Sequence, residues 1–293
     1  MGQMDYKELK NNCFMRQADK DRFSLRLRIA GGKVGVQDLK KVYELAEKYG
    51  EGYIHLTSRQ SIEIPFLKFE ELDAIKKEMQ EAGLRGGFCG ARVRTITACQ
   101  GCTVCQSGLI DSADLAQEFD ALYYGREVPH KFKIGITGCH NNCLKAEEND
   151  LGIKGAMKPV WNKETCTYCG LCESKCRHGA IHVDKQNKTL VHDESACILC
   201  GKCVKACPVQ AWTGEPGFKV YIGGLFGNSI QIGRQAVPIV YSKEELHAII
   251  EATIEFFKTH GKKGERLGKA LNRIGWEPLF DELNEVVKNH KKD

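Results

Sequence analysis

Cysteine spacing is the feature of this chain that most constrains its fold. Two runs share the spacing C-x2-C-x2-C-x3-C, and a C-x5-C pair and a C-x3-C pair precede them. The runs are Cys166, Cys169, Cys172, Cys176 and Cys197, Cys200, Cys203, Cys207, and the pairs are Cys99 with Cys105 and Cys139 with Cys143. Short loops of this kind wrap thiolates around an iron–sulfur cubane. The three sets of four cysteines therefore suggest three clusters and a protein that transfers electrons.

In the two-cluster ferredoxin pattern, the fourth cysteine of each run belongs to the other cluster. The pattern assigns Cys166, Cys169, Cys172 and Cys207 to one [4Fe-4S] cluster, and Cys176, Cys197, Cys200 and Cys203 to the other. Arg177 departs from the pattern, which often has proline at this place. Structural zinc sites are the alternative, since C-x2-C pairs also bind zinc. They would leave the third and fourth cysteines of each run unexplained.

Composition indicates an ordinary soluble protein, with 42% apolar and 28% charged residues. No stretch approaches the roughly 20 apolar residues of a membrane span, and the polar first residues do not resemble a secretory signal. We therefore expect a cytoplasmic protein whose cysteines bind metal and do not form disulfides. Much of the net charge of +5 lies near the C-terminus without any nucleic-acid-binding motif. No nucleic-acid partner is expected, although an acidic redox partner could dock there.

Hydrophobic periodicity predicts a compact α+β unit over residues 1–82. Residues 23–29 alternate apolar and polar, which is typical of a strand with one buried face. Further along come a helix, two strand-like segments and a second helix, at 39–49, 53–56, 61–66 and 69–82. This β-α-β-β-α order predicts an α+β fold.

The rest of the chain is predicted to be one larger domain interrupted by the cysteine-dense block. Strand-like segments at 132–136 and 218–222 flank that block. Three helical segments close the chain, near 242–259, 264–273 and 276–290. We therefore expect a first piece over 83–162, an inserted block over 163–213 and a second piece over 214–293.

Short motifs spread along the chain resemble those of the siroheme-containing sulfite and nitrite reductases. They are Thr57-Ser58-Arg59-Gln60, Cys99-Gln-Gly-Cys-Thr-Val-Cys105, Gly138-Cys139-His140-Asn141-Asn142-Cys143, Asp150-Leu151-Gly152, Gly223-Gly224-Leu225-Phe226-Gly227 and Asn272-Arg273-Ile274-Gly275. The inserted block makes the anaerobic and dissimilatory-type sulfite reductases the most similar group. The resemblance implies a ferredoxin-like half-domain over 1–82, a siroheme and [4Fe-4S] α/β domain over 83–162 and 214–293, and a bacterial-type 2x[4Fe-4S] ferredoxin domain over 163–213.

The same resemblance gives the upstream cysteines a role. By themselves these pairs are also compatible with zinc, a redox pair or unrelated thiols. The family likeness implies a third [4Fe-4S] cluster held by Cys99, Cys105, Cys139 and Cys143. Cys143 would also be the axial thiolate of the siroheme iron, so that one sulfur joins cluster and haem. His140 stands where the family usually has proline, and we interpret it as a hydrogen-bonding neighbour of the cluster and not as a ligand.

Two arginines and two lysines match the positions with which the family binds its anionic substrate. They are Arg59, Arg94, Lys131 and Lys133. Arginine forks suit oxyanions, and a lysine crowded by other cations has a lowered pKa and can donate protons. Lys131 and Lys133 alternate along an expected strand, so both would project from one face. The alternative for each residue alone is an exposed surface cation.

A few residues receive weaker interpretations. Arg92 and Lys154 could be further contacts to siroheme carboxylates. Cys13, Cys89 and Cys102 have no assigned role and are interpreted as buried or incidental thiols. Cys102 lies inside the C-x5-C loop, which leaves an alternative ligand role open for it.

The resemblance implies an oxidoreductase that reduces sulfite to sulfide with six electrons. The first alternative is the reduction of nitrite to ammonia at the same site, because both anions need similar cations. The second is an electron-transfer subunit without its own substrate site. Neither Gly31-Gly32 nor Gly223-Gly224 lies in a nucleotide-binding context. Electrons are therefore expected from a ferredoxin or from a flavin-bearing partner subunit.

Oligomeric state is the last expectation. Longer family members contain two fused copies of this unit, and their anion-binding cations and cluster cysteines come from opposite copies. This chain has one copy that carries both sets. We therefore expect a homodimer, or a heterodimer with a related chain, in which each site takes cations from one protomer and cysteines from the other.

Overall fold

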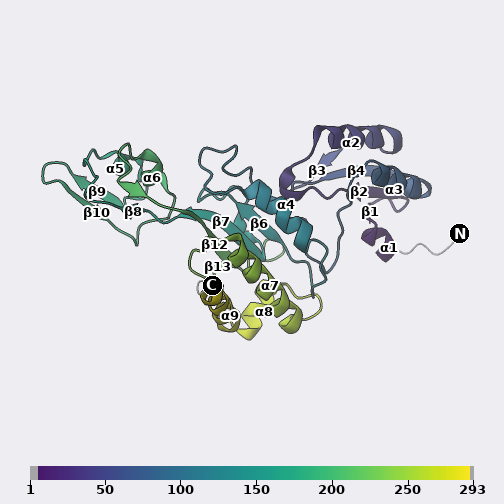
Figure 1. The fold of residues 1–293 in the computed structure, drawn as a ribbon. Coiled ribbons are helices and arrows are strands. Elements are labelled where there is room, and N and C mark those ends of the chain that lie inside the picture. The colour runs from purple at the N-terminus through teal and green to yellow at the C-terminus, as the bar shows by residue number, and fades with distance from the viewer. Residues whose placement is uncertain (1–5, 291–293) are drawn as a thin grey trace.

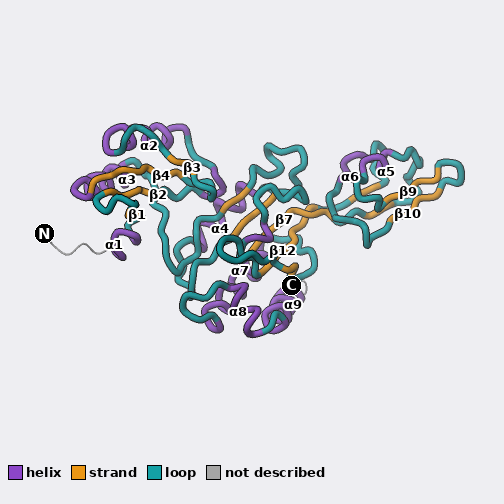
Figure 2. The backbone as a smooth tube through the Cα atoms, turned by 180° about the vertical axis from the view of Figure 1, so that it is seen from behind, coloured by secondary structure: helices purple, strands orange, loops and turns teal. Residues whose placement is uncertain are grey.

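The computed structural model describes residues 6–290 and has three parts arranged in a row (Figure 1). An N-terminal α+β unit lies at one end, a five-stranded sheet with helices forms the middle, and a cysteine-rich lobe projects from the other end. The view from behind gives the same order (Figure 2). The α+β fold predicted from the sequence is confirmed. No helix within residues 6–290 has both the length and the apolar character needed to span a membrane.

The N-terminal unit is an antiparallel sheet with strand order β1-β2-β4-β3. Its elements are α1 (Tyr6–Asn11), β1 (Phe14–Arg16), β2 (Arg22–Arg26), a 3-10 turn (Ala30–Gly32), α2 (Val36–Tyr49), β3 (His55–Leu56), β4 (Ile62–Lys68), a second 3-10 turn (Phe69–Glu71) and α3 (Leu72–Glu81). Alternation along β2 and β4 buries Phe23, Leu25 and Ile64 with apolar residues of α2 and α3. Sequence periodicity missed α1 and β1, which are too short to show a repeat.

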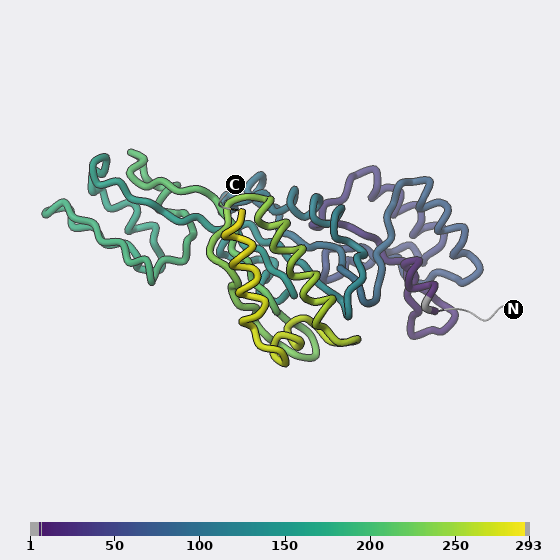
Figure 3. Tube along the Cα trace, turned by 60° about the horizontal axis from the view of Figure 1, so that its bottom comes forward, coloured from purple at the N-terminus to yellow at the C-terminus, as the bar shows by residue number. Residues whose placement is uncertain are grey.

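The middle part is a sheet with strand order β13-β12-β7-β6-β5. Its elements are β5 (Thr97–Ala98), α4 (Ser112–Tyr123), β6 (Ile134–Thr137), a 3-10 turn (Ala146–Glu148), β7 (Leu151–Met157), β12 (Pro216–Ile222), β13 (Arg234–Gln235), α7 (Lys243–His260), α8 (Leu267–Ile274) and α9 (Glu277–His290). Helix α4 is tied to α7 by a 2.8 Å hydrogen bond between Tyr123 Oη and His247 Nδ1. The C-terminal helices, green to yellow, lie across this part (Figure 3).

The cysteine-rich lobe continues the antiparallel β7–β12 pair outward. Strands β8 (Val160–Trp161) and β11 (Trp212–Thr213) pair at its base. Beyond them lie α5 (Leu171–Lys175), the hairpin of β9 (Ile181–Asp184) and β10 (Thr189–His192), and α6 (Lys202–Ala206). The chain therefore enters and leaves the lobe at one place.

The two cysteine runs of the lobe share one backbone conformation. Tyr168 has a left-handed backbone conformation (φ 54°), and Leu199, 31 positions later, has the same conformation (φ 61°). The Ala180 N–H donates to Cys176 Sγ at 3.3 Å, and the Ala211 N–H donates to Cys207 Sγ at 3.2 Å at the equivalent place. Each run therefore folds in the same way around its cysteines.

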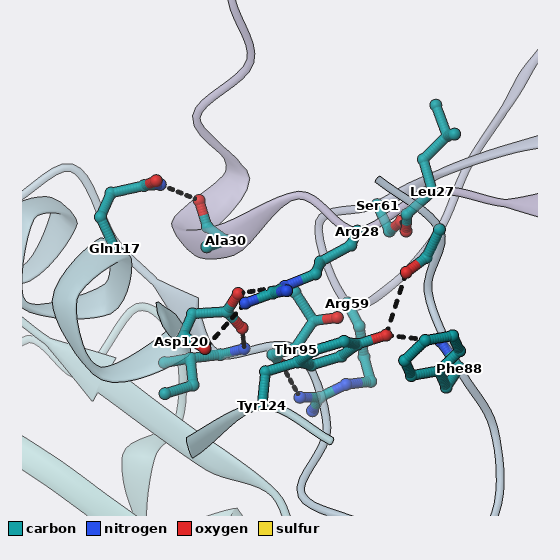
Figure 4. A network of polar contacts seen from close by, with 12 residues as sticks. Leu27, Arg28, Ala30, Arg59, Ser61, Phe88, Thr95, Gln117, Asp120 and Tyr124 are labelled. Carbon is teal, nitrogen blue, oxygen red and sulfur yellow. Dashed lines mark hydrogen bonds and ion pairs between the residues drawn. The ribbon is translucent and has the colours of Figure 1, made fainter. Parts of the chain in front are cut away.

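A polar network joins the N-terminal unit to the middle part (Figure 4). Arg28 Nε donates to Asp120 Oδ2 at 2.6 Å, and the guanidinium of Arg28 lies over the Tyr124 ring, 3.9 Å from its centre. Gln117 Nε2 donates to the Ala30 carbonyl at 2.7 Å. These contacts hold the turn after β2 against α4.

Candidate functional site

The first predicted cysteine set surrounds a cavity in the lobe, which we call the distal cavity. It is lined by Cys166, Cys169, Cys172 and Cys207. The last of these comes from the other run, as the two-cluster pattern predicted. Burial raises the pKa of the Cys172 thiol, while the nearby Trp212 side chain, which also lines the cavity, acts in the opposite direction. Four sulfurs thus face one enclosed space.

The second predicted set surrounds a separate space, the proximal cavity. It is lined by Cys176, Cys197, Cys200 and Cys203, together with His178, His192 and Lys202. Burial raises the pKa of Cys203 to about 12, and the neighbouring Cys200 and Cys197 act in the same direction. Close approach of several thiols in a buried place is unfavourable for bare thiolates and is compensated when they ligate a metal.

The third set lies on loops at the ends of two adjacent strands. Cys99 follows β5, and Cys139 lies two residues after β6. Burial raises the pKa of Cys139, and nearby Cys105, Cys99 and Cys143 raise it further, so the four thiols are neighbours. Cys99 Sγ accepts a hydrogen bond from the Gly138 N–H at 3.0 Å and is in hydrogen-bond contact with Ser112 Oγ at 3.2 Å. Burial acts to raise the pKa of Cys99, but these contacts outweigh it and the pKa is lowered. Cys143, the last cysteine of the set, is exposed.

These donor sets fit iron–sulfur clusters. All the predicted ligands are sulfur atoms, which iron–sulfur clusters prefer, and backbone N–H groups already point at several of them. Within residues 6–290 no three His, Cys, Asp or Glu side chains converge on a single-ion site. The lobe sulfurs instead stand around two cavities, which is the arrangement that a multi-atom cluster requires.

The proximal cavity and the third set are in direct contact through the protein. Lys205 Nζ, on α6, donates to the carbonyls of Gln106 at 3.0 Å and Gly108 at 2.9 Å, directly after the C-x5-C motif. Val204 packs against a small buried cluster that contains Cys139. The distal cavity takes no part in these contacts. The lobe therefore presents its second run to the middle part.

Three of the four predicted cations, Arg94, Lys131 and Lys133, flank one short ladder together with Arg92. Val93 and Phe132 form a parallel bridge and are both buried. The Arg94 N–H donates to the Phe132 carbonyl at 2.8 Å. Because side chains alternate along extended backbone, the residues on either side of the bridge project from the opposite face. These residues are Arg92, Arg94, Lys131 and Lys133.

Arg59 and Arg94 line a cavity of about 300 Å³ on the inner side of the N-terminal unit. Arg59 Nη2 donates to the Thr95 carbonyl at 2.7 Å, as Figure 4 also shows. Arg94 donates to the carbonyls of Phe88 at 3.2 Å and Gly90 at 2.9 Å. Burial and the charge of Arg94 lower the pKa of Arg59 to about 10, which leaves it charged at neutral pH. Both arginines are thus held by backbone carbonyls, and neither forms an ion pair with a carboxylate within residues 6–290, although the charge of Asp150 acts on Arg59. This arrangement suits an anion.

Lys133 does not line this cavity but is close enough to Arg59 to be affected by its charge, and Lys131 also acts on Lys133. Burial, with the charges of Arg59 and Arg266, lowers the pKa of Lys133 to about 8. Such a lysine exchanges a proton near neutral pH. Arg59 therefore interacts electrostatically with both Arg94 and Lys133, and Lys131 acts on Lys133.

Sequence reasoning missed the buried ion pair beneath these cations. Arg266 donates to Asp150 through Nε at 2.9 Å and Nη2 at 2.7 Å, and Asp150 also accepts the Lys133 N–H at 2.8 Å. The Asp150 carboxylate is fully buried. Asp150 lies in a recognisable motif, but its partner is 116 positions away and has no local signal.

The weaker predictions have ordinary partners. Arg92 pairs with Glu127 at 3.3 Å, and Lys154 pairs with Glu147 on the sheet. His140 is half-buried beside Cys139, and its Nδ1 is buried with no hydrogen-bond partner in the part of the chain that the structure describes.

Among the unassigned cysteines, Cys13 and Cys89 lie apart from the three sets, whereas Cys102 lies in the loop between Cys99 and Cys105. Cys13 is buried in the N-terminal core, Cys102 is exposed, and Cys89 accepts a hydrogen bond from Arg26 Nη1 at 2.8 Å. A further cavity of about 310 Å³, between α2 and α4, is lined by none of the predicted residues. The Arg28–Asp120 ion pair forms part of its wall.

Comparison with known proteins is informative over most of the chain. Residues 89–291 match the family described as "Nitrite and sulphite reductase 4Fe-4S domain", and residues 15–82 match "Nitrite/Sulfite reductase ferredoxin-like half domain". The coenzyme F420-dependent sulfite reductase of Methanocaldococcus jannaschii is 32% identical over 260 residues, which are 88% of this chain and 41% of that protein. A subunit of the anaerobic sulfite reductase of Salmonella typhimurium is 34% identical over 217 residues, which are 68% of this chain and 64% of that relative.

A solved structure has a similar fold. The crystal structure of dissimilatory sulfite reductase I superposes with a TM-score of 0.73 at 22% identity, covering 89% of this chain and 69% of that one. The chain thus spans less than two thirds of the length of both sequence relatives named above.

Proposed function

The chain belongs to the family of nitrite and sulphite reductases, which are oxidoreductases, and from this premise we propose that it reduces sulfite to sulfide with six electrons. The observation that carries the proposal is the cavity lined by Arg59 and Arg94 beside Lys133. An electron-transfer subunit without a substrate has no need of clustered, half-buried cations that form no ion pair within residues 6–290, since such charges are costly unless an anion binds there.

The family implies siroheme and [4Fe-4S] chemistry, and we assign three clusters to the three cysteine sets. Cys143 is proposed to bind both the third cluster and the siroheme iron, and its exposure at the protein surface supports this. When bound, siroheme would supply the iron at which the anion is reduced. The protein supplies the charge, the protons and the positioning described next.

Arg59 and Arg94 are proposed to hold the anion with their guanidinium groups, since both are fixed by backbone carbonyls. Lys133 is proposed to carry a proton on Nζ and to release it as each oxygen leaves as water. Lys131 projects from the same face as Lys133 and would supply further positive charge near the anion. The Asp150–Arg266 pair fixes the backbone of Lys133 through its N–H.

We propose that electrons pass from the distal to the proximal cavity and then to the third set. The contacts of Lys205 with the loop after Cys105, and of Val204 with Cys139, support this order. A ferredoxin or a flavin-bearing subunit would deliver electrons to the outer end of the lobe. A homodimer, or a heterodimer with a related chain, is proposed to share cations and cysteines between protomers. An active enzyme that stays monomeric would contradict that arrangement.

Anaerobically prepared protein tests the proposal directly. Iron and acid-labile sulfide are measured with the visible spectrum, and then sulfite and nitrite reduction are assayed with a reduced viologen dye. The proposal expects siroheme absorption and a larger kcat/KM for sulfite. A much larger value for nitrite would favour reduction of nitrite to ammonia by the same residues. Clusters without siroheme would favour the electron-transfer subunit.

A further inference from the structure

Four ring nitrogens are buried without a hydrogen-bond partner among residues 6–290. They are His140 Nδ1, Trp161 Nε1, His192 Nε2 and Trp212 Nε1. A buried N–H that is left unpaired costs on the order of 1–3 kcal/mol, so each such group calls for an explanation. Three of the four stand at the three predicted cluster sites, one at each.

The positions in the lobe are the clearest. Trp212 lines the distal cavity with Cys166, Cys169, Cys172 and Cys207. His192 lines the proximal cavity with Cys176, Cys197, Cys200 and Cys203. The His192 and Trp212 rings touch edge to face, with centroids 5.1 Å apart, between the two cavities. Each ring therefore lines a cavity that is surrounded by four cysteines, and it also packs against the other ring.

His140 occupies the corresponding place at the third site. It follows Cys139 directly, in a loop whose other cysteine is Cys143. Lys202 and His178, which line the proximal cavity, are close enough to His140 to act on it electrostatically. The His140 ring therefore lies at the seam between the third site and the proximal cavity, where both sets of cysteines are close.

We infer that Trp212, His192 and His140 each donate a ring N–H hydrogen bond to the sulfur atoms of one cluster and thereby raise its reduction potential. The inference rests on the proposed function, since it needs the three clusters. A reduced cluster carries one more negative charge than an oxidised one, so a donor aimed at its sulfurs stabilises the reduced state. The two histidines carry the proton on the nitrogen that is buried and unpaired. They act as positioning and tuning residues and do not ligate iron.

Trp161 provides a matched control within the same lobe. Its Nε1 is also buried and unpaired, but the residue lines neither cavity. Its ring packs against Trp212, with centroids 6.4 Å apart, and against Tyr168. Trp161→Phe therefore removes an unpaired N–H from the lobe without touching a cluster.

The experiment is a redox titration of the anaerobic, fully loaded protein followed by electron paramagnetic resonance. Trp212→Phe and His192→Phe keep a ring in place and remove the N–H. Each is expected to shift the equilibrium of one cluster toward the oxidised state by about tenfold, which is about 59 mV for a one-electron couple. Trp161→Phe is expected to leave all three potentials unchanged. Unchanged potentials in both cavity variants, or an equal shift in Trp161→Phe, would overturn the inference.

A second measurement covers variants that fail to assemble. Wild-type protein labelled with 15N in tryptophan, or in histidine, is studied by pulsed electron paramagnetic resonance in the reduced state. A hyperfine coupling to one cluster is expected with the tryptophan label and couplings to two clusters with the histidine label, and the lack of any coupling would overturn the inference. Iron and sulfide analysis separates the two failures. Protein without clusters contradicts the proposed function, whereas intact clusters with unaltered potentials contradict only the hydrogen bonds.

Discussion

Replacing Lys133 by arginine tests whether this side chain supplies protons. Burial and the nearby cations lower its pKa from an ordinary value of 10.5 to about 8. Since the lowered pKa favours the neutral amine, Lys133 can donate below about pH 8 and is neutral above it. The protonated fraction falls from about nine tenths at pH 7 to about one tenth at pH 9, so the rate of a step that uses this proton falls roughly tenfold.

The assay is sulfite reduction with a reduced viologen between pH 6 and pH 10, in the wild type, Lys133→Arg and Lys258→Arg. The fall centred near pH 8 is expected in the wild type and in Lys258→Arg, since Lys258 lies on the exposed surface of α7. Lys133→Arg keeps the positive charge but titrates far above this range, so its profile should lose that fall and its maximum rate should drop. Because sulfite itself ionises in this pH range, the role of Lys133 is judged from the difference between the profiles of the three proteins. A Lys133→Arg profile that still falls near pH 8 would refute the role of this lysine.

Two further predictions concern stability and the lobe. Arg266→Leu leaves the Asp150 carboxylate buried without its partner, and this should lower the free energy of unfolding in urea by about 3–5 kcal/mol. Arg273→Leu removes the solvent-screened pair with Glu265 and should lower it much less. Equal losses of stability in the two variants would contradict this account. Gly201→Ala should reduce the iron content, because its φ is +65° and a Cβ would lie 2.8 Å from a Met157 sulfur, beside the proximal cavity. Gly179 has the same φ, but a Cβ added there would have no atom within 4 Å, so Gly179→Ala should lose less iron than Gly201→Ala. Equal iron loss in the two variants would mean that backbone strain, and not the contact with Met157, is responsible.

The sequence alone predicts those parts of the site that depend on the spacing of neighbouring residues. The C-x2-C-x2-C-x3-C runs predicted which four cysteines would face each cavity, because the repeat fixes two equivalent loops and the fourth ligand follows from their exchange. Alternation also predicted that Lys131 and Lys133 project from one face. These are consequences of periods of a few residues.

What sequence missed depends on contacts between distant segments. Asp150 and Arg266 meet only after the C-terminal helices fold over the sheet. The bridge between Val93 and Phe132, which aligns Arg94 with Lys133, joins segments that carry no pairing signal. His192 and Trp212 gave no motif either, since a ring nitrogen becomes informative only when burial leaves it without a partner.

The paired strands β8 and β11 have a consequence for how such proteins can change over time. Because the two strands are neighbours, cutting the lobe away would leave chain ends about 5 Å apart, a gap that a tight turn can close. The β7–β12 pair would then be an ordinary hairpin. Recombination could therefore graft or delete the cysteine-rich lobe as a cassette, while the pairing of β7 with β12 is kept.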